Sequence, residues 1–248
     1  MTNCHYIPVL TPKECEIYLK KIYSLKCSWI KRSANLPFYT LGLVAYLDGP
    51  TGEYNNLGKR NKYNNLLTNN FSDLHKKVTA SLSCILKTPC EIYNNSAIPG
   101  FHIYINNENL GDARAVHQNT PHTDIQFKYV FPEKGLKQED FVSFTLCLSC
   151  GPDSGLNLWE PNIPLPENVL DFVTESSMIS IHSQDPLSKY ATQSIFEKPS
   201  MFIPYCAGKM VVHHGVFYHH PVLKATKIPR ITLQGHGVKK DGKFLLFW

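Results

Sequence analysis

The segment TPHTDIQF places His122 and Asp124 two residues apart, and the later segment GVFYHHPV supplies further imidazoles. On an extended segment, residues i and i+2 project to the same side. An imidazole and a carboxylate from one strand, with an imidazole from another, form the 2-His-1-carboxylate arrangement that binds iron(II) and leaves positions open. The H-x-D spacing alone is weak, because 11 histidines and 20 acidic residues in 248 positions give roughly one match by chance. The plain alternative is a strand histidine beside a turn aspartate.

The distal imidazole is predicted at His219, with His220 as the open alternative, because strand phase decides which of two neighbours points inward. His213 and His214 lie 17 and 16 residues before Arg230, which is a long step. His220 has a plausible spacing, but it shares its face with apolar and aromatic residues, namely Val216, Tyr218 and Val222.

The segment RITLQGHG alternates four polar residues with an apolar face, as the wall of a polar cavity in a β-barrel requires. The polar residues are Arg230, Thr232, Gln234 and His236. An arginine there can pair with a carboxylate through two hydrogen bonds, and Thr232 can add a hydroxyl. No acidic residue occurs between Glu197 and Asp241, which favours an external anion over an ordinary solvent-facing strand. Tyr104 and Thr145, on polar faces of other strands, are further candidates for hydrogen bonds to this ligand.

Together, H-x-D at His122 and Asp124, a distal histidine at His219, and R-x-T at Arg230 and Thr232 resemble the iron(II)/2-oxoglutarate-dependent oxygenase family. The eleven-residue step from His219 to Arg230 is similar to that family's spacing between its second histidine and its oxoglutarate arginine. GLNLWE also resembles a family segment, and the likeness covers roughly residues 98–238. FYTLGLVAYLDG and IPGFHIYI resemble the branch that contains free-amino-acid hydroxylases and their radical-halogenase relatives.

The resemblance implies that His122, Asp124 and His219 hold iron(II), and that Arg230 and Thr232 bind 2-oxoglutarate. With O2, such an enzyme oxidises an unactivated C–H bond, most simply by hydroxylation. Family halogenases carry a small residue where Asp124 stands, so the resemblance favours hydroxylation over chlorination. Demethylation, desaturation and cyclisation remain open, as do three rivals: a protein or peptide hydroxylase, a cupin-like metalloenzyme that does not use 2-oxoglutarate, and a non-catalytic binding module.

The composition, with 43% hydrophobic and 18% charged residues, is typical of a globular protein without a membrane span. Eight cysteines and no secretory signal at the amino terminus indicate free thiols in a reducing cytoplasm. In the CxxC formed by Cys147 and Cys150, strand alternation predicts opposite faces, which disfavours a zinc site. The basic residues are scattered, which gives no indication of a nucleic-acid partner. Nothing in the sequence predicts an oligomeric state.

These residues need elements that position them. Thr11, Pro12 and Glu14 predict a capped helix start, followed by a core-facing stripe of Cys15, Tyr18, Leu19 and Ile22. A second helix is expected after Ser72, with Leu74, Val78, Leu82 and Ile85 on one side, and a third at 166–173. From residue 98 onward, nine short apolar segments separated by turn residues predict strands. They are GFHIYIN, HTDIQFKYV, FVSFTLCLSC, GLNLWE, SMFIPY, KMVVHH, VFYHHPV, RITLQGHGV and FLLFW.

The predicted fold is therefore an all-β core with flanking helices, a double-stranded β-helix (jelly-roll or cupin-like) with amino-terminal α-helices. We expect one domain over 1–248, with a helical part at 1–97 and the jelly-roll core at 98–248. The Asn-rich stretch at 54–70 is expected to be a long loop, either a plain surface loop or a lid. A lid would enclose a small polar substrate such as a free amino acid, with Gln234 and His236 beside it.

Overall fold

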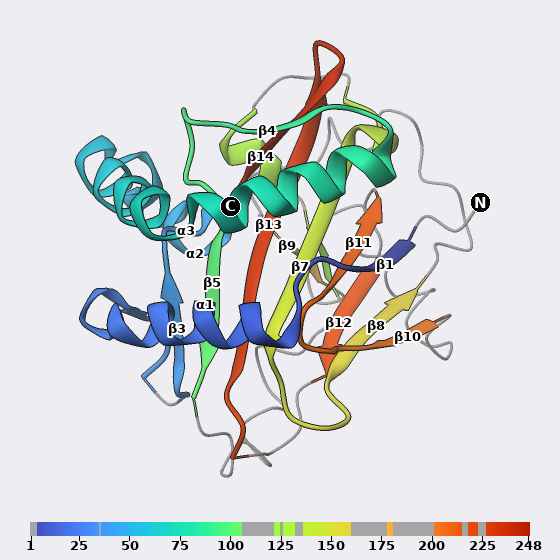
Figure 1. Cartoon of the computed structure of the whole chain (residues 1–248). Coiled ribbons are helices and arrows are strands. Elements are labelled where there is room, and N and C mark those ends of the chain that lie inside the picture. The colour runs from blue at the N-terminus through green and yellow to red at the C-terminus, as the bar shows by residue number, and fades with distance from the viewer. Residues whose placement is uncertain are drawn as a thin grey trace.

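The computed structural model describes residues 4–34, 36–105, 122–124, 126–131, 136–159, 178–180, 201–214, 218–222 and 227–248. Within these residues, a larger and a smaller sheet make up the core, and two long helices lie across the front of the larger sheet (Figure 1). No helix of this described part is long and apolar enough to cross a membrane.

The larger sheet of the described chain has nine strands, and most of them pair antiparallel. Along its main path lie β1 (Cys4–Pro8), β11 (Lys209–His214), β7 (Phe141–Ser149), β13 (Arg230–Lys240), β5 (Gly100–Tyr104), β3 (Phe38–Leu41) and β2 (Ile30–Lys31). Strand β14 (Lys243–Phe247) pairs with the far end of β13, and β4 (Cys90–Ile92) pairs parallel to β14. The smaller sheet has the order β10 (Met201–Pro204), β8 (Gly155–Trp159), β12 (Tyr218–Val222), β6 (His122–Asp124) and β9 (Met178–Ser180).

Each of the nine segments predicted as strands from residue 98 onward contains a strand of the structure. The segment HTDIQFKYV is strand only at β6, because a 3-10 helix, η4 (Gln126–Tyr129), follows it. The sequence did not predict β1, β2, β4 or β9, which are two to five residues long. The predicted helix at 166–173 lies outside the described residues.

Helix α1 (Pro12–Ser24) begins as predicted. The Thr11 side chain accepts a hydrogen bond from the Glu14 amide, and the Glu14 carboxylate accepts one from the Thr11 amide. This reciprocal pairing satisfies backbone donors that the first helical turn leaves without an intrahelical partner. Cys15, Tyr18 and Ile22 are buried against the larger sheet, which confirms the predicted stripe.

The prediction of a long loop at 54–70 is wrong, because most of this stretch is the first half of helix α3 (Leu57–Leu86). Asn56 caps the helix by accepting a hydrogen bond from the Lys59 amide. The Asn64 amide group bonds the Ser96 carbonyl and the Ile98 amide, so this asparagine joins the helix to the chain that leads into β5. Tertiary contacts of this kind override the weak intrinsic helix propensity of asparagine.

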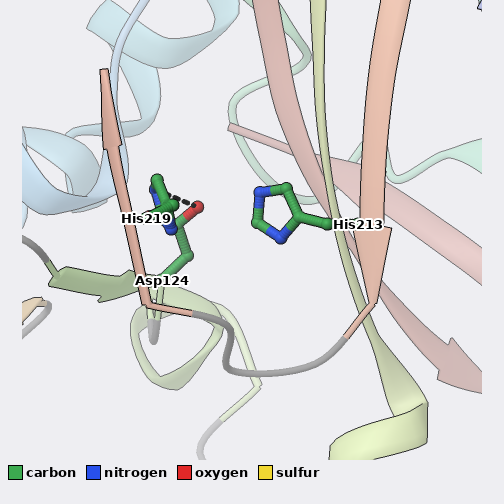
Figure 2. Close-up of side chains that lie close together, drawn as sticks. All are labelled: Asp124, His213 and His219. Atoms are coloured by element: carbon green, nitrogen blue, oxygen red, sulfur yellow. Dashed lines mark ion pairs between the residues drawn. The ribbon is translucent and has the colours of Figure 1, made fainter. Parts of the chain in front are cut away.

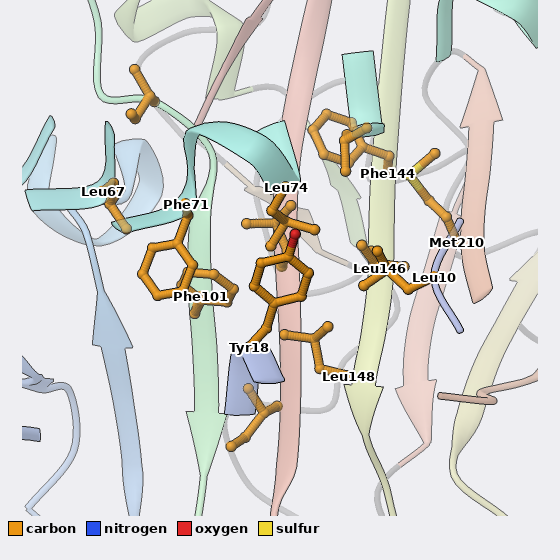
Figure 3. Packing of buried hydrophobic residues seen from close by; sticks show 14 of the residues in the cluster. Leu10, Tyr18, Leu67, Phe71, Leu74, Phe101, Phe144, Leu146, Leu148 and Met210 are labelled. Carbon is orange, nitrogen blue, oxygen red and sulfur yellow. The ribbon is translucent and has the colours of Figure 1, made fainter. Parts of the chain in front are cut away.

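The backbone of α3 leaves helical geometry at Phe71, where φ is −134° and ψ is 18°. The kink divides the Asn-rich half from the half predicted to begin after Ser72. Leu67, Phe71 and Leu74 are all buried in the main core, on both sides of the kink. Figure 3 shows Phe71 packed against Phe101 of β5, with the two rings 4.7 Å apart between centroids. Both halves of the helix are therefore anchored on the sheet, which gives no support to the lid hypothesis.

Strand alternation separates two environments on the larger sheet. The side chains that face α1 and α3 are apolar and form the main core; from the strands they include Phe101, Ile103, Val142, Phe144, Leu146, Met210, Val212, Ile231 and Leu233 (Figure 3). Their neighbours in sequence face the smaller sheet. There Cys147 and Val211 pack against Leu156 and Leu158 of β8. The polar residues of the candidate site share this inner face.

A bulge near the end of β7 corrects the predicted geometry of the CxxC. Ile231 pairs with Ser149 and Thr232 with Cys147, so Leu148 is an extra residue in β7. As a result Cys147 and Cys150 face the same way and pack in the same cluster, where sequence alternation predicted opposite faces. The interaction with Cys147 lowers the pKa of the Cys150 thiol below its usual value. All eight cysteines are free thiols, as predicted.

A buried ion pair fixes the short helix α2 (Ala45–Asp48) beside β3. The Arg32 guanidinium donates two hydrogen bonds to the Asp48 carboxylate, at 2.7 and 2.8 Å. Its Nε donates a third to Thr40 of β3, and the Val44 amide donates to the same carboxylate. The two side chains are 8% and 5% exposed, so solvent screens this pair little.

We expect Asp48→Ala to lower the free energy of unfolding by about 3–5 kcal/mol, because it leaves the Arg32 charge buried without its partner. Urea denaturation with an unchanged m-value measures this loss. The matched control is Glu91→Ala, which removes the surface pair of Glu91 with Lys243 and should cost less than about 1 kcal/mol. Equal losses from the two variants would show that the Arg32–Asp48 pair is not a stabilising centre.

Candidate metal centre and anion pocket

Asp124 and His219 meet on neighbouring strands of the smaller sheet. Strands β6 and β12 pair antiparallel, with His219 directly opposite residue 122 in the register. The Asp124 Oδ2 and His219 Nε2 atoms lie 3.4 Å apart, and their side chains are about one-tenth exposed (Figure 2). His219, the predicted distal histidine, therefore has its ring in contact with the Asp124 carboxylate. His122 is described in its backbone only, at the first position of β6.

A second imidazole, from His213, faces this pair from the larger sheet. His213 lies near the end of β11, and Figure 2 shows its ring turned toward Asp124 and His219. One ligand atom from each of the three residues lies within 4.8 Å of the other two. Carboxylate and imidazole donors suit iron, zinc and related divalent metals. The sequence argument set His213 aside because of its distance from Arg230. His213 lies two residues after Val211, which points inward, so the two share a strand face; this alternation could have indicated His213 from the sequence.

His236, predicted as a substrate residue, lies close to Asp124. Its Nδ1 atom is 3.6 Å from Asp124 Oδ2 and 3.0 Å from Ser143 Oγ, which belongs to the neighbouring strand β7. Burial lowers the pKa of His236, while the nearby Asp124 charge opposes that shift. His236, which Ser143 contacts in turn, can therefore orient the Asp124 carboxylate, as residues next to metal ligands do in metal sites.

Arg230 forms a second centre, at the start of β13. It is 3% exposed, and its guanidinium lies 5.6 Å from the ring centre of Tyr104 and 5.2 Å from that of Tyr205. Its Nε has no hydrogen-bond partner among the described residues. No carboxylate of the described residues forms an ion pair with it. A buried cation with a free donor fits an external anion.

The other predicted anion-pocket residues lie around Arg230 on the inner face. Thr232 is fully buried, and it lies opposite His102 of the neighbouring strand β5. Tyr104 pairs with Arg230 itself and stacks on Phe38, with ring centroids 4.4 Å apart. Burial raises the pKa of Tyr104 to about 12, so the phenol stays protonated and can donate a hydrogen bond.

The remaining predicted residues lie one step further along β13. Thr145 of β7 pairs in register with Gln234, so the two residues stand side by side on the larger sheet. The Gln234 amide donates to the Thr232 hydroxyl at 3.2 Å, which links it to the anion pocket. The structure thus brings Arg230, Thr232 and Gln234 onto one continuous wall.

Sequence reasoning missed a neutral polar pair formed by Tyr46 of α2 and His102 of β5. The Tyr46 hydroxyl lies 3.1 Å from His102 Nε2. Burial lowers the pKa of His102 well below its usual value, and the charge of Arg230 adds to that effect. Burial also raises the pKa of Tyr46 well above its usual value. Both groups are therefore uncharged near neutral pH, and each can hydrogen-bond a ligand. No spacing in the sequence pointed to Tyr46.

The two centres fit the groups that the sequence resemblance implies. The carboxylate and imidazoles around Asp124 have the donor chemistry of an iron(II) site. The Nε of Arg230, without a partner in the described part of the chain, and the hydroxyls of Thr232 and Tyr104 suit a ligand carboxylate. The residues of the Asp124 cluster come from both sheets, and those of the Arg230 centre lie on the inner face of the larger sheet.

No protein-family model matches the sequence, and no curated protein matches it either. Solved structures match the fold. The non-heme alpha-ketoglutarate-dependent epimerase SnoN of nogalamycin biosynthesis has a TM-score of 0.54 at 14% identity, covering 97% of this chain and 82% of its own. An N-substituted L-amino acid dioxygenase from Burkholderia ambifaria AMMD has a TM-score of 0.54 at 11% identity, covering 99% and 86%. The carbocyclase SnoK, also non-heme and alpha-ketoglutarate-dependent, has a TM-score of 0.52 at 13% identity, covering 100% and 92%.

At these identities the likeness establishes the fold. The chain has the jelly-roll fold of the non-heme alpha-ketoglutarate (2-oxoglutarate)-dependent enzymes, which confirms the predicted fold class.

Proposed function

We propose that this chain is an iron(II)- and 2-oxoglutarate-dependent oxygenase that hydroxylates an unactivated C–H bond of a small polar molecule. One observation carries the proposal: a carboxylate–imidazole cluster lies near a buried arginine on the inner face of the larger sheet, and the Nε of that arginine has no hydrogen-bond partner among the described residues. The cluster suits a divalent transition metal, and the arginine suits the carboxylate of a dicarboxylic cosubstrate. A fold shared with enzymes of this chemistry supports both assignments.

In this proposal His122, Asp124 and His219 hold the metal, and His236 with Ser143 orients the Asp124 carboxylate. Iron(II) with 2-oxoglutarate and O2 supplies the oxidation of the C–H bond. The protein places the substrate and excludes water, which the buried walls of the site support.

The cosubstrate would be held mainly by Arg230, whose planar fork matches a carboxylate. Thr232 adds a hydroxyl hydrogen bond, and the protonated Tyr104 phenol stands ready as a further donor. Thr145 lies next to Gln234 in the same wall and can bond the cosubstrate or the substrate.

We propose a free amino acid or a close derivative as the substrate. Uncharged polar groups lie near these two centres: Tyr46 and His102 are close to both Arg230 and Asp124, and Gln234 bonds to Thr232. Such groups select a small molecule through hydrogen bonds. One solved structure of this fold is named as an N-substituted L-amino acid dioxygenase, while others are an epimerase and a carbocyclase. Hydroxylation is the simplest reaction for this chain, and a product that has gained one oxygen atom distinguishes it from epimerisation or ring closure.

We also propose that residues 1–248 act as one domain in the cytoplasm. The 1–97 part supplies four strands of the larger sheet, and its helices cover the core that 98–248 builds. The eight free thiols support a reducing compartment.

The direct test begins with thermal-shift screening of amino acids and N-substituted derivatives with Mn(II) and the inert analogue N-oxalylglycine. Ligands that bind only the folded state raise its melting temperature. Each hit is then incubated with Fe(II), 2-oxoglutarate and O2. We expect one hit to stimulate succinate formation and to gain an oxygen atom.

Three outcomes would contradict this function. Stimulation by a peptide or protein alone would point to a macromolecular substrate. Product formation without 2-oxoglutarate would identify a cupin-like metalloenzyme. Ligand binding without turnover, with the metal bound, would indicate a binding module.

A further inference from the structure

We propose that His213 is a fourth protein donor, which binds the metal in the resting enzyme and yields its place to the cosubstrate. The inference rests on the proposed function and concerns a residue to which neither the sequence pattern nor the resemblance gives a role. Figure 2 shows the basis for it: His213 reaches the pair of Asp124 and His219 from the opposite sheet.

The geometry is close to that of a common coordination sphere. The ring centroids of His213 and His219 lie 5.0 Å apart, and the three candidate ligand atoms lie within 4.8 Å of one another. Metal–imidazole bonds of about 2.1 Å would let donor atoms around one ion stand up to about 4.2 Å apart. A side-chain movement of about half an ångström, within ordinary thermal displacement, closes the difference.

The backbone makes the approach of His213 a fixed feature of the fold. Strand β11 is paired on both sides, with β1 and with β7, and His213 itself lies opposite Cys4 and Ser143 in those two registers. Met210 and Val212 face the main core, so His213 must face the smaller sheet. Only 4% of the residue is exposed, so its imidazole lies inside the protein, away from solvent.

Counting coordination positions decides when His213 can bind. A metal held by two imidazoles and one carboxylate would keep three further positions. A chelating 2-oxo acid would fill two of them and leave one for O2. A permanent fourth protein donor would leave too few positions, so His213 and the chelating cosubstrate compete for one of them. In the resting enzyme His213 then strengthens metal binding and leaves O2 one fewer position at the metal.

The test measures anaerobic Co(II) binding to the full chain by calorimetry and by the visible spectrum, with and without N-oxalylglycine. The variant is His213→Phe, which fills the space without a donor atom. The control is His5→Phe, which removes an imidazole from β1 of the same sheet. Without the analogue, we expect His213→Phe to weaken Co(II) binding about tenfold or more and to change the spectrum. With the analogue present, affinity and spectrum should match the wild type. His5→Phe should change neither.

Two results would overturn the inference: an equal loss of affinity with and without the analogue, or no loss in either condition. His213→Gln checks that a misfolded Phe variant does not mimic the effect, since it should give the same pattern with a smaller side chain. A wild-type protein that binds no Co(II) in either condition would instead refute the metal site of the proposed function.

Discussion

Asp124→Ala is expected to reduce succinate formation and substrate oxidation by at least about 100-fold, because it removes the only carboxylate of the proposed metal site. Asp124 Oδ2 is also the atom that His219 and His236 both approach, at 3.4 and 3.6 Å. Its loss therefore removes a charged donor and the partner that orients two imidazoles. Anaerobic Fe(II) titration and a succinate assay measure the two consequences separately.

The matched variant for this experiment is Asp124→Asn, which keeps the side-chain shape but lacks the charge. It should retain the fold, seen in an unchanged circular dichroism spectrum, and still lose most of the metal affinity. The surface variant Glu91→Ala should leave metal binding and turnover as they are. Oxidation at the wild-type rate in Asp124→Ala would refute the assignment of this residue.

Arg230→Ala is expected to raise the 2-oxoglutarate concentration needed for half-maximal turnover by about 10- to 150-fold. This range corresponds to about 1.5–3 kcal/mol for a hydrogen bond to a charged group. Arg230 is buried between Tyr104 and Tyr205, and none of the described carboxylates pairs with it, so the cosubstrate is its expected counter-ion. Turnover as a function of 2-oxoglutarate concentration, at saturating substrate and iron, gives the number.

Two companion variants sharpen this result. Arg230→Lys keeps the charge but loses the planar fork, so its requirement should lie between those of wild type and Arg230→Ala. Lys239→Ala removes an exposed cation from the same strand and should have no effect. An unchanged 2-oxoglutarate requirement in Arg230→Ala would show that Arg230 does not bind the cosubstrate.

The sequence predicted most of the elements that position the site, because short alternating strands leave a clear pattern. The inner face of β13 and the capped start of α1 follow from local rules of alternation and capping. The Asn-rich half of α3 did not, because it is held by tertiary contacts such as the bonds of Asn64 to the chain before β5. No local pattern contains that information.

The site shows the same division. Strand phase favoured His219 over His220, and the structure sets the His219 ring against Asp124. The pairing of distant strands brings His213 to the site, and the Arg32–Asp48 pair fixes the short helix that carries Tyr46. Spacing along the chain reveals neither contact. The bulge at Leu148 likewise turned two cysteines to one side, because a single inserted residue reverses strand phase.

The donors around Asp124 belong to two different sheets, so a bound ion would affect the stability of the folded protein. An ion held by Asp124 and His219 on one side and approached by His213 on the other ties the sheets together, much as a reversible cross-link would. At a free metal concentration 100 times the dissociation constant, such binding adds about 2.7 kcal/mol to the free energy of unfolding. A shortage of the proposed metal would then shorten the protein's lifetime in addition to removing the proposed activity, because proteases cut the unfolded form.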